Sequence, residues 1–144
     1  MNSFVLSRKV SLVDIVIDAA KQMGEGVNLT CLTFEMPQTA GVKLLRAQNA
    51  GILKSISVYM EANHRRKKNW VSAMVLSGWN IYNVKIHAKI ALLENHNCKR
   101  VFLSSNNWQA GGCLEFCYEI PDTHIVDEIF QQCNSVLSEF VPLK

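Results

Sequence analysis

The chain has 144 residues, of which 49% are hydrophobic and 19% are charged, and its formal net charge at pH 7 is +3. A chain of this length is sufficient for one domain, and it has no run near the roughly 18 apolar residues needed to cross a membrane. The N-terminus lacks the long apolar run and the small-residue cleavage site of a secretory signal. We therefore expect one cytoplasmic domain over residues 1–144, with a slight preference for anionic partners.

Predicted helices alternate with predicted strands along the first half of the chain. Apolar residues at helical spacing follow Ser11, which makes a capping-box-like start with Asp14. The strand-like segments are rich in β-branched residues or alternate with period two, and each is followed by a helical pattern. The predicted elements are helices at 11–23, 38–49 and 69–76 and strands at 27–34 and 55–62.

The second half begins with a strict alternation of apolar and other residues that predicts a strand at 84–92. A turn at 95–98 leads into a neighbouring strand, and a further strand at 114–120 is followed by Asp122, which can cap the last helix. Strands that alternate with helices predict an α/β fold, layered as α/β/α, with a mixed central sheet whose C-terminal strands are antiparallel. The last helix is expected to direct four apolar residues toward the core: Ile125, Ile129, Val136 and Leu137.

The five cysteines are an odd number in a chain without an export signal, which favours free thiols over disulfide bonds. Cys31 and Cys117 lie in apolar strand-like runs, where a thiol packs as a small hydrophobic group. The cysteines and histidines show none of the C-x2-C spacing of common zinc sites. We therefore expect no metal site.

Three nitrogen bases share one face of the strand predicted at 84–92, namely Lys85, His87 and Lys89. His87 and Lys89 are about 7 Å apart at the backbone if the segment is extended. Ser105 and Asn107 repeat this spacing on the next strand or at its end. A neutral histidine can attack phosphorus, and lysine and asparagine can hold phosphoryl oxygens. These residue types predict part of a phosphoryl-transfer site.

The order of these residues resembles a known signature. HAK at 87–89, then four residues, then Glu94, and SSNN at 104–107 are similar to the HxKx4D and GSxN motifs of the phospholipase D superfamily. The resemblance is closest to small single-motif members, nucleases included, and it extends over most of the chain. It implies a phospholipase D-like fold and no cofactor. It also implies catalytic roles for His87, Lys89, Ser105 and Asn107.

Two positions depart from the family pattern, because Glu94 stands at the usual aspartate and Ser104 at the usual glycine. The resemblance implies a structural role for Glu94. In the family a downstream glutamate orients the catalytic histidine by a hydrogen bond. Glu115 is the candidate for that role, with Glu119 as the alternative.

The resemblance implies a mechanism in which one histidine attacks phosphorus while a second histidine protonates the leaving group. This chain carries one HxK motif, so the second histidine would come from an identical chain in a homodimer. Because Lys89 and Asn107 would stabilise the phosphoryl oxygens, no metal is expected.

Candidate substrate-binding residues lie beside this motif. The basic run at 64–68, with Arg65, Arg66 and Lys67, is either a solvated loop or a set of phosphate contacts, and Lys85 is a further candidate. Trp108 could stack on a base, although a tryptophan just after a strand is more often part of the core. The main hypothesis is a nuclease acting on DNA or RNA. The alternatives are a phospholipid-directed phosphodiesterase and a nucleic-acid-binding module that has lost turnover.

Overall fold

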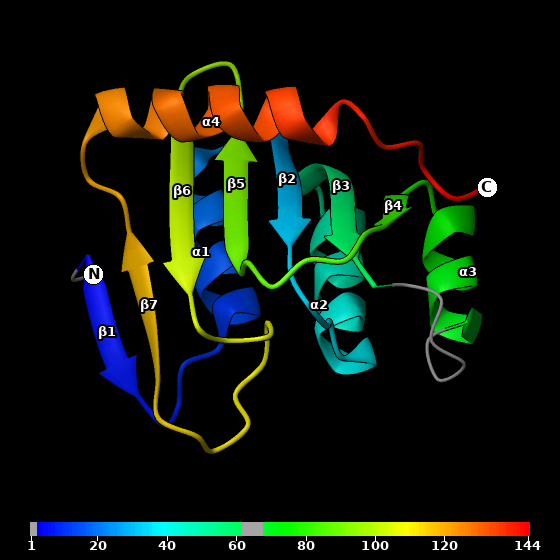
Figure 1. The fold of residues 1–144 in the computed structure, drawn as a ribbon, viewed down its shortest axis with the longest axis horizontal. Coiled ribbons are helices and arrows are strands. Elements are labelled where there is room, and N and C mark those ends of the chain that lie inside the picture. The colour runs from blue at the N-terminus through cyan, green and yellow to red at the C-terminus, as the bar shows by residue number, and fades with distance from the viewer. Residues whose placement is uncertain (1–2, 62–67) are drawn as a thin grey trace.

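The computed structural model describes residues 3–61 and 68–144. In this part of the chain, seven strands form one mixed sheet in the order β1-β7-β6-β5-β2-β3-β4 (Figure 1). The strands are β1 (Phe4–Ser7), β2 (Val27–Leu32), β3 (Leu53–Met60), β4 (Asn80–Asn83), β5 (Ile90–Glu94), β6 (Lys99–Ser104) and β7 (Glu115–Glu119). The helices are α1 (Leu12–Met23), α2 (Gln38–Asn49), α3 (Lys68–Leu76) and α4 (Thr123–Leu137).

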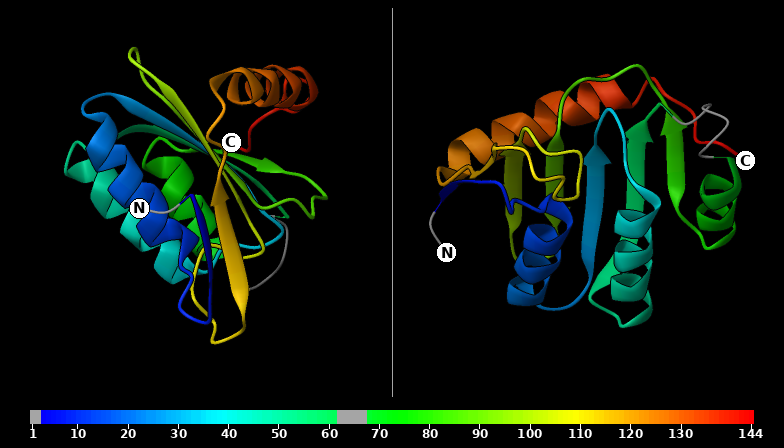
Figure 2. Two further views of the ribbon diagram at one scale, coloured as in Figure 1. Left: turned by 90° about the vertical axis from the view of Figure 1, so that its left-hand side faces the viewer. Right: turned by 90° about the horizontal axis from the view of Figure 1, so that it is seen from below.

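The helices cover both faces of the sheet, as the layered prediction required. Helices α1, α2 and α3 lie on one face and α4 lies on the other (Figure 2). The larger hydrophobic cluster fills the space under α1 to α3, and the smaller one includes Val126 and Phe130 of α4. Because α4 crosses the strands near the β5–β6 turn, the opposite edge of the sheet is left without a helix on this face (Figure 1).

The sheet is mixed, which confirms the prediction. Strands β2, β3 and β4 pair in parallel, whereas β5 pairs antiparallel with both β2 and β6. Strand β7 pairs antiparallel with β6 and with β1. The β5–β6 hairpin closes where Asn95 N–H donates to Cys98 O at 3.1 Å, at the turn expected from the sequence.

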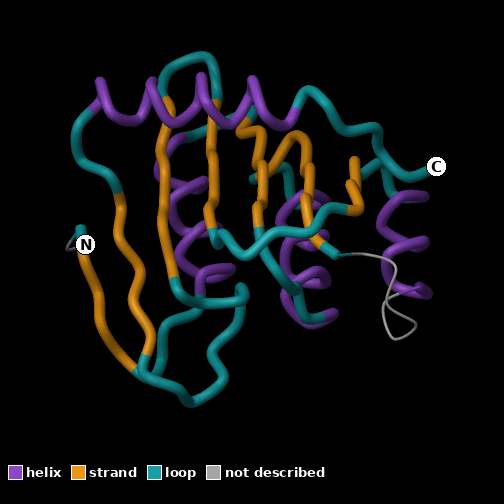
Figure 3. Tube along the Cα trace, in the orientation of Figure 1, coloured by secondary structure: helices purple, strands orange, loops and turns teal. Residues whose placement is uncertain are grey.

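The single strand predicted at 84–92 is wrong. Its first six residues, 84–89, are irregular, and only Ile90 onward belongs to β5. The reason lies in the strand order, because the chain must pass from β4 at the sheet margin over β3 and β2 before it can enter β5 (Figure 3). The alternating pattern is nevertheless real, since Val84 and Ile86 pack against the smaller cluster during this crossing.

Two short strands, β1 and β4, were not predicted. The expectation for α4 is confirmed for Leu137, which is buried, and for Ile129, which packs against the smaller cluster, and it is wrong for Ile125 and Val136. Val126 and Phe130 face the sheet, whereas Ile125 and Val136 are 43% and 59% exposed. Helix α4 contacts the sheet along one side only, so some of its apolar residues lie outside the buried stripe and are exposed. Asp122 caps α4 as predicted, and its carboxylate accepts from the N–H groups of residues 124 and 125.

The buried thiols agree with the prediction for Cys31 and Cys117. Burial raises the pKa of Cys31 well above its usual value and that of Cys117 to about 11. Both therefore remain neutral thiols near pH 7. In residues 3–61 and 68–144, no helix has the length and apolar character needed to span a bilayer.

Candidate active site

The candidate catalytic residues gather at one edge of the sheet. Antiparallel pairing brings the carboxyl ends of β2 and β6 to the same side as the amino ends of β5 and β7. We call this side the site edge, and it is the edge that α4 does not cover (Figure 1). The ends of four strands therefore bring several short segments together at the site edge, namely residues 33–34, 87–89, 105–107 and 115.

The HAK segment lies directly before β5. The side chain of His87 is exposed and that of Lys89 is half-buried. Lys89 Nζ donates to His87 O at 3.2 Å, and Ser104 N–H donates to Lys89 O at 3.0 Å. These bonds fix the backbone of the HAK segment against the end of β6. The two motifs recognised in the sequence are thus neighbours in space.

The SSNN segment begins at Ser104, the last residue of β6, and its other three residues follow the strand. Ser104 Oγ donates to Phe116 O at 2.7 Å and accepts from Asn106 N–H at 2.9 Å. Ser105 Oγ accepts from Phe116 N–H at 3.0 Å. Trp108 is the one non-glycine residue with positive φ in the described ranges, so Ser104 meets no backbone strain in place of a glycine. Its hydroxyl instead ties the segment to β7.

The two asparagines of this segment have different surroundings. Asn106 is fully buried, and its Nδ2 donates to Val10 O, Gln109 O and the carboxylate of Glu115. Asn107 is half-buried at the site edge, with its Oδ1 3.3 Å from Thr33 Oγ1. Of the two asparagines, Asn107 is therefore the one that is accessible at the site edge.

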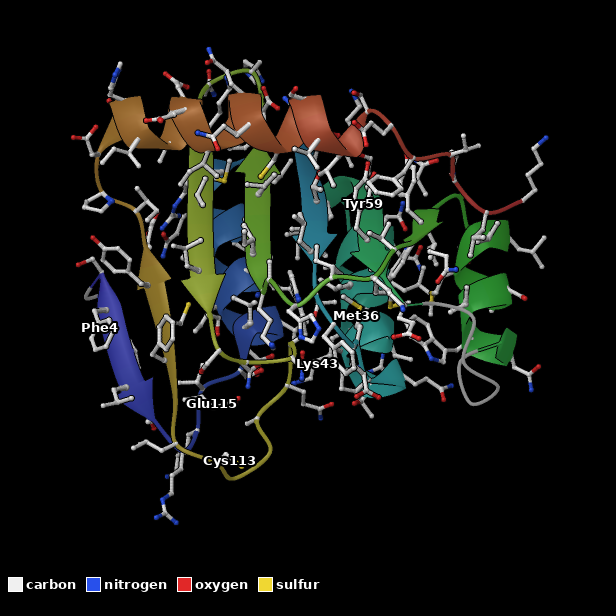
Figure 4. The ribbon with its side chains drawn as sticks, viewed as in Figure 1. Phe4, Met36, Lys43, Tyr59, Cys113 and Glu115 are labelled. Carbon is white, nitrogen blue, oxygen red and sulfur yellow. The ribbon has the colours of Figure 1, made fainter. Side chains whose placement is uncertain are left out.

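Glu115 begins β7 at the site edge, near the loop that carries Cys113 (Figure 4). One of its oxygens accepts from Asn106, which places Glu115 in the network that supports the SSNN segment. The alternative candidate, Glu119, accepts two hydrogen bonds from Arg100, at 2.6 and 2.7 Å. The guanidinium of Arg100 is thereby engaged, and this bonding to Glu119 raises the pKa of Arg100.

Trp108 is 0% exposed, so it presents no face to a nucleobase. Its assignment to substrate binding is therefore wrong, and the alternative assignment to the core is correct. The positive φ of 76° at this residue turns the chain inward, and Trp108 O accepts from the N–H of Val13 in the first turn of α1.

The remaining candidates lie outside this cluster or outside the described ranges. Lys85 is exposed on the irregular segment that leads to His87. Glu94 ends β5 at the opposite edge, about 16 Å from Lys89 along the strand. Arg65, Arg66 and Lys67 lie in residues 62–67, which the structure does not describe.

Sequence reasoning missed two residues of the site, Thr33 and Phe34, which follow β2. Thr33 is fully buried and contacts Asn107, and the ring of Phe34 stacks on His87 with centroids 5.5 Å apart and planes at 18°. The available signal was an aromatic residue just after a buried strand. Among the described residues, no group of three His, Cys, Asp or Glu side chains could hold a metal ion.

Comparison with known proteins supports this fold. No family model and no curated protein match the sequence. Among solved structures, NucT from Helicobacter pylori matches with a TM-score of 0.66 and 12% identity, over 97% of this chain and 99% of NucT. Nuc from Salmonella typhimurium, a phospholipase D family member, matches with a TM-score of 0.57 and 14% identity, over 91% of this chain and 90% of Nuc. This chain has the phospholipase D fold.

The phospholipase D fold also matches part of a larger protein. Polyphosphate kinase from Porphyromonas gingivalis gives a TM-score of 0.62 at 15% identity over 91% of this chain. This chain spans 22% of that kinase. The fold expected from the sequence motif is confirmed, and at these identities the comparisons establish the fold alone.

Proposed function

We propose that this protein is a metal-independent phosphodiesterase that cleaves nucleic acid, DNA or RNA, through a phosphohistidine on His87. The observation that carries the proposal is the meeting of His87, Lys89 and Asn107 at one uncovered sheet edge. The backbone bond from Ser104 N–H to Lys89 O joins the HAK and SSNN segments at the ends of β5 and β6. Polyphosphate kinase from Porphyromonas gingivalis, which has a similar fold, is named for chemistry on phosphate groups.

The chemistry follows from these three side chains. A neutral nitrogen of His87 attacks phosphorus, an N–P bond forms, and the P–O bond to the leaving group breaks. Lys89 and Asn107 donate to the non-bridging oxygens, where negative charge accumulates in the transition state. Water then attacks phosphorus, the N–P bond breaks, and the histidine is restored with the phosphate monoester as product.

The leaving oxygen needs a proton and the attacking water must lose one, so a second acid–base group is required. We propose that His87 of a second copy supplies it across a two-fold axis. This site would therefore be completed in a homodimer, with each copy contributing the same three residues. One imidazole acts as nucleophile while the other gives its proton to the leaving group and later takes one from water.

A hydrolysis assay in the presence of a chelator tests the proposal. We expect wild-type protein to cleave single-stranded or duplex oligonucleotides in excess EDTA, and His87→Ala to lose at least about 1,000-fold in kcat because the nucleophile is absent. His96→Ala is the matched control, since His96 is an exposed histidine in the β5–β6 turn at the opposite sheet edge. Equal activity of His87→Ala and wild type would refute the proposal.

Capture of the intermediate separates an active enzyme from a binding module without turnover. Acid-labile phosphate on His87 after a short incubation with labelled substrate is expected for the enzyme. Salt-sensitive binding without any cleavage would instead support the binding module.

One observation favours phospholipid as a second candidate substrate. Leu114 is 64% exposed in the loop before β7, and Phe34 is 39% exposed beside His87, so apolar side chains line the site edge. Such a rim is expected where an enzyme meets a lipid surface. Headgroup release from anionic liposomes, compared with oligonucleotide cleavage by the same preparation, discriminates the two substrates.

A further inference from the structure

The ring of Phe34 is placed against the imidazole of His87 in a way that the sequence motif does not include. The two rings are nearly parallel, at 18°, with centroids 5.5 Å apart. Offset stacking of this kind is a favourable arrangement for aromatic pairs. Phe34 is 39% exposed, so this contact accounts for part of the burial of a large apolar side chain at the protein surface.

Phe34 is held on a rigid base. Thr33 before it is fully buried, and its N–H donates to Tyr59 O at 3.1 Å, which extends the pairing of β2 with β3 by one residue. Met36 after it is 1% exposed, and α2 begins at Gln38. Because the chain is anchored on both sides of Phe34, its ring can restrict the motion of a side chain that contacts it.

The side chain of His87, in contrast, has little support, although the backbone of the HAK segment is bonded to the end of β6. It lies on the irregular segment between β4 and β5, where no strand ladder holds it. Lys89 bonds to the backbone carbonyl of His87 and not to its ring. Across residues 3–61 and 68–144, the structure gives the imidazole no hydrogen bond, and its ring contact is with Phe34.

We propose that Phe34 is a positioning residue for His87, an inference that rests on the proposed function. The offset stacking covers part of one face of the imidazole and does not cover its edge, where both ring nitrogens lie. The contact therefore limits rotation of the ring about its bond to the chain while a nitrogen stays available for attack on phosphorus. A misplaced nucleophile costs a large factor in rate even when the substrate still binds.

The test compares variants at position 34 that keep or remove the aromatic ring. Phe34→Leu keeps an apolar side chain without a ring, and Phe34→Tyr keeps the ring. We expect Phe34→Leu to lower kcat about tenfold with KM changed less than about twofold, because positioning acts on the reaction and not on substrate binding. Phe34→Tyr should stay within about twofold of wild type. Phe4→Leu is the matched control, because Phe4 is a 52% exposed aromatic residue that stacks on Phe116.

A second readout does not need turnover. The ring-proton NMR signals of His87, assigned by their loss in His87→Ala, should shift in Phe34→Leu and remain in place in Phe34→Tyr, because a stacked ring perturbs its neighbour. The positioning role is overturned if Phe34→Leu shifts the His87 signals but leaves kcat unchanged. It is also overturned if Phe34→Leu changes neither the His87 signals nor kcat. If wild type cleaves no substrate, the proposed function fails by itself. In that case the NMR comparison still decides whether Phe34 orders the His87 ring, with unshifted signals overturning the inference.

Discussion

Asn106 and Asn107 are adjacent residues whose different environments predict different consequences of substitution. Asn106 is buried and bonds to two backbone carbonyls and to Glu115, and its Oδ1 accepts from Leu12 N–H at 3.3 Å. Asn106→Ala leaves several of these groups buried without a partner, at a cost of about 3 kcal/mol in the free energy of unfolding. Urea unfolding followed by circular dichroism measures this cost.

The matched variant is Asn107→Ala, which removes the half-buried neighbour and its hydrogen bond with Thr33. We expect it to lower the free energy of unfolding by less than about 1 kcal/mol and to reduce cleavage strongly, because a donor to the phosphoryl oxygens is lost. Equal destabilisation by the two variants would contradict this division of roles.

Two substitutions at Glu115 can distinguish a structural role of this residue from a catalytic role. In Glu115→Gln the side-chain amide oxygen can still accept from Asn106, so we expect the free energy of unfolding of this variant to stay within about 0.5 kcal/mol of wild type. Glu115→Ala removes the acceptor, so we expect its free energy of unfolding to fall by about 2 kcal/mol. If the carboxylate also orients His87, Glu115→Gln should lower kcat about tenfold, because an amide cannot balance the imidazolium charge. Thermal unfolding and initial rates on one preparation give both values. Unchanged kcat would leave Glu115 as a supporting residue only.

At the scale of elements, periodicity predicted best where the local pattern and the packing agree. Helices α1, α2 and α4 were located by their apolar spacing and by caps such as Asp122. The same reasoning failed for the segment 84–89, which alternates like a strand and partly buries Val84 and Ile86. It forms no strand of its own, and its printed backbone bonds to strands lie at its two ends, from Val84 N–H to Met60 O and from Ser104 N–H to Lys89 O. Period two reports which side chains face inward, and it does not report whether a strand lies alongside.

The start of α1 shows a limit of local signals. Ser11 is at the cap position predicted from the sequence, yet its hydroxyl makes no capping bond. The N–H of Leu12 instead donates to Asn106 Oδ1, and the N–H of Val13 donates to Trp108 O. These partners lie more than 90 residues away, so no local pattern could reveal them. The SSNN segment therefore also fastens α1 to the sheet.

Several residues of the candidate site could be predicted from the sequence, but the way in which the fold brings them together could not. His87, Lys89 and Asn107 were found because a family motif fixes their spacing along the chain. Thr33 and Phe34 were missed because they reach the site through the strand order, which puts β2 beside β5. Long-range pairing of this kind is set by packing of the whole sheet.

At the scale of the whole molecule, the decisive property is the number of chains in the active unit. Within residues 3–61 and 68–144, one chain supplies one histidine at the site edge, His87, whereas the proposed reaction needs a nucleophile and an acid–base partner. We therefore expect light scattering to give a dimer at the concentrations used for assay. A strict monomer that still cleaves would contradict the shared site.

Mixing active and inactive chains tests the sharing of the site directly. In a dimer of wild type with His87→Ala, one of the two imidazoles is missing, so every mixed dimer should be inactive. After subunit exchange with a ninefold excess of His87→Ala, random pairing leaves about one tenth of wild-type chains in active dimers. Activity should therefore fall about tenfold. The control is the same excess of Phe4→Leu, a variant with an intact HAK segment, which should not reduce activity. Activity that stays at the wild-type level in the His87→Ala mixture would show that each chain acts alone.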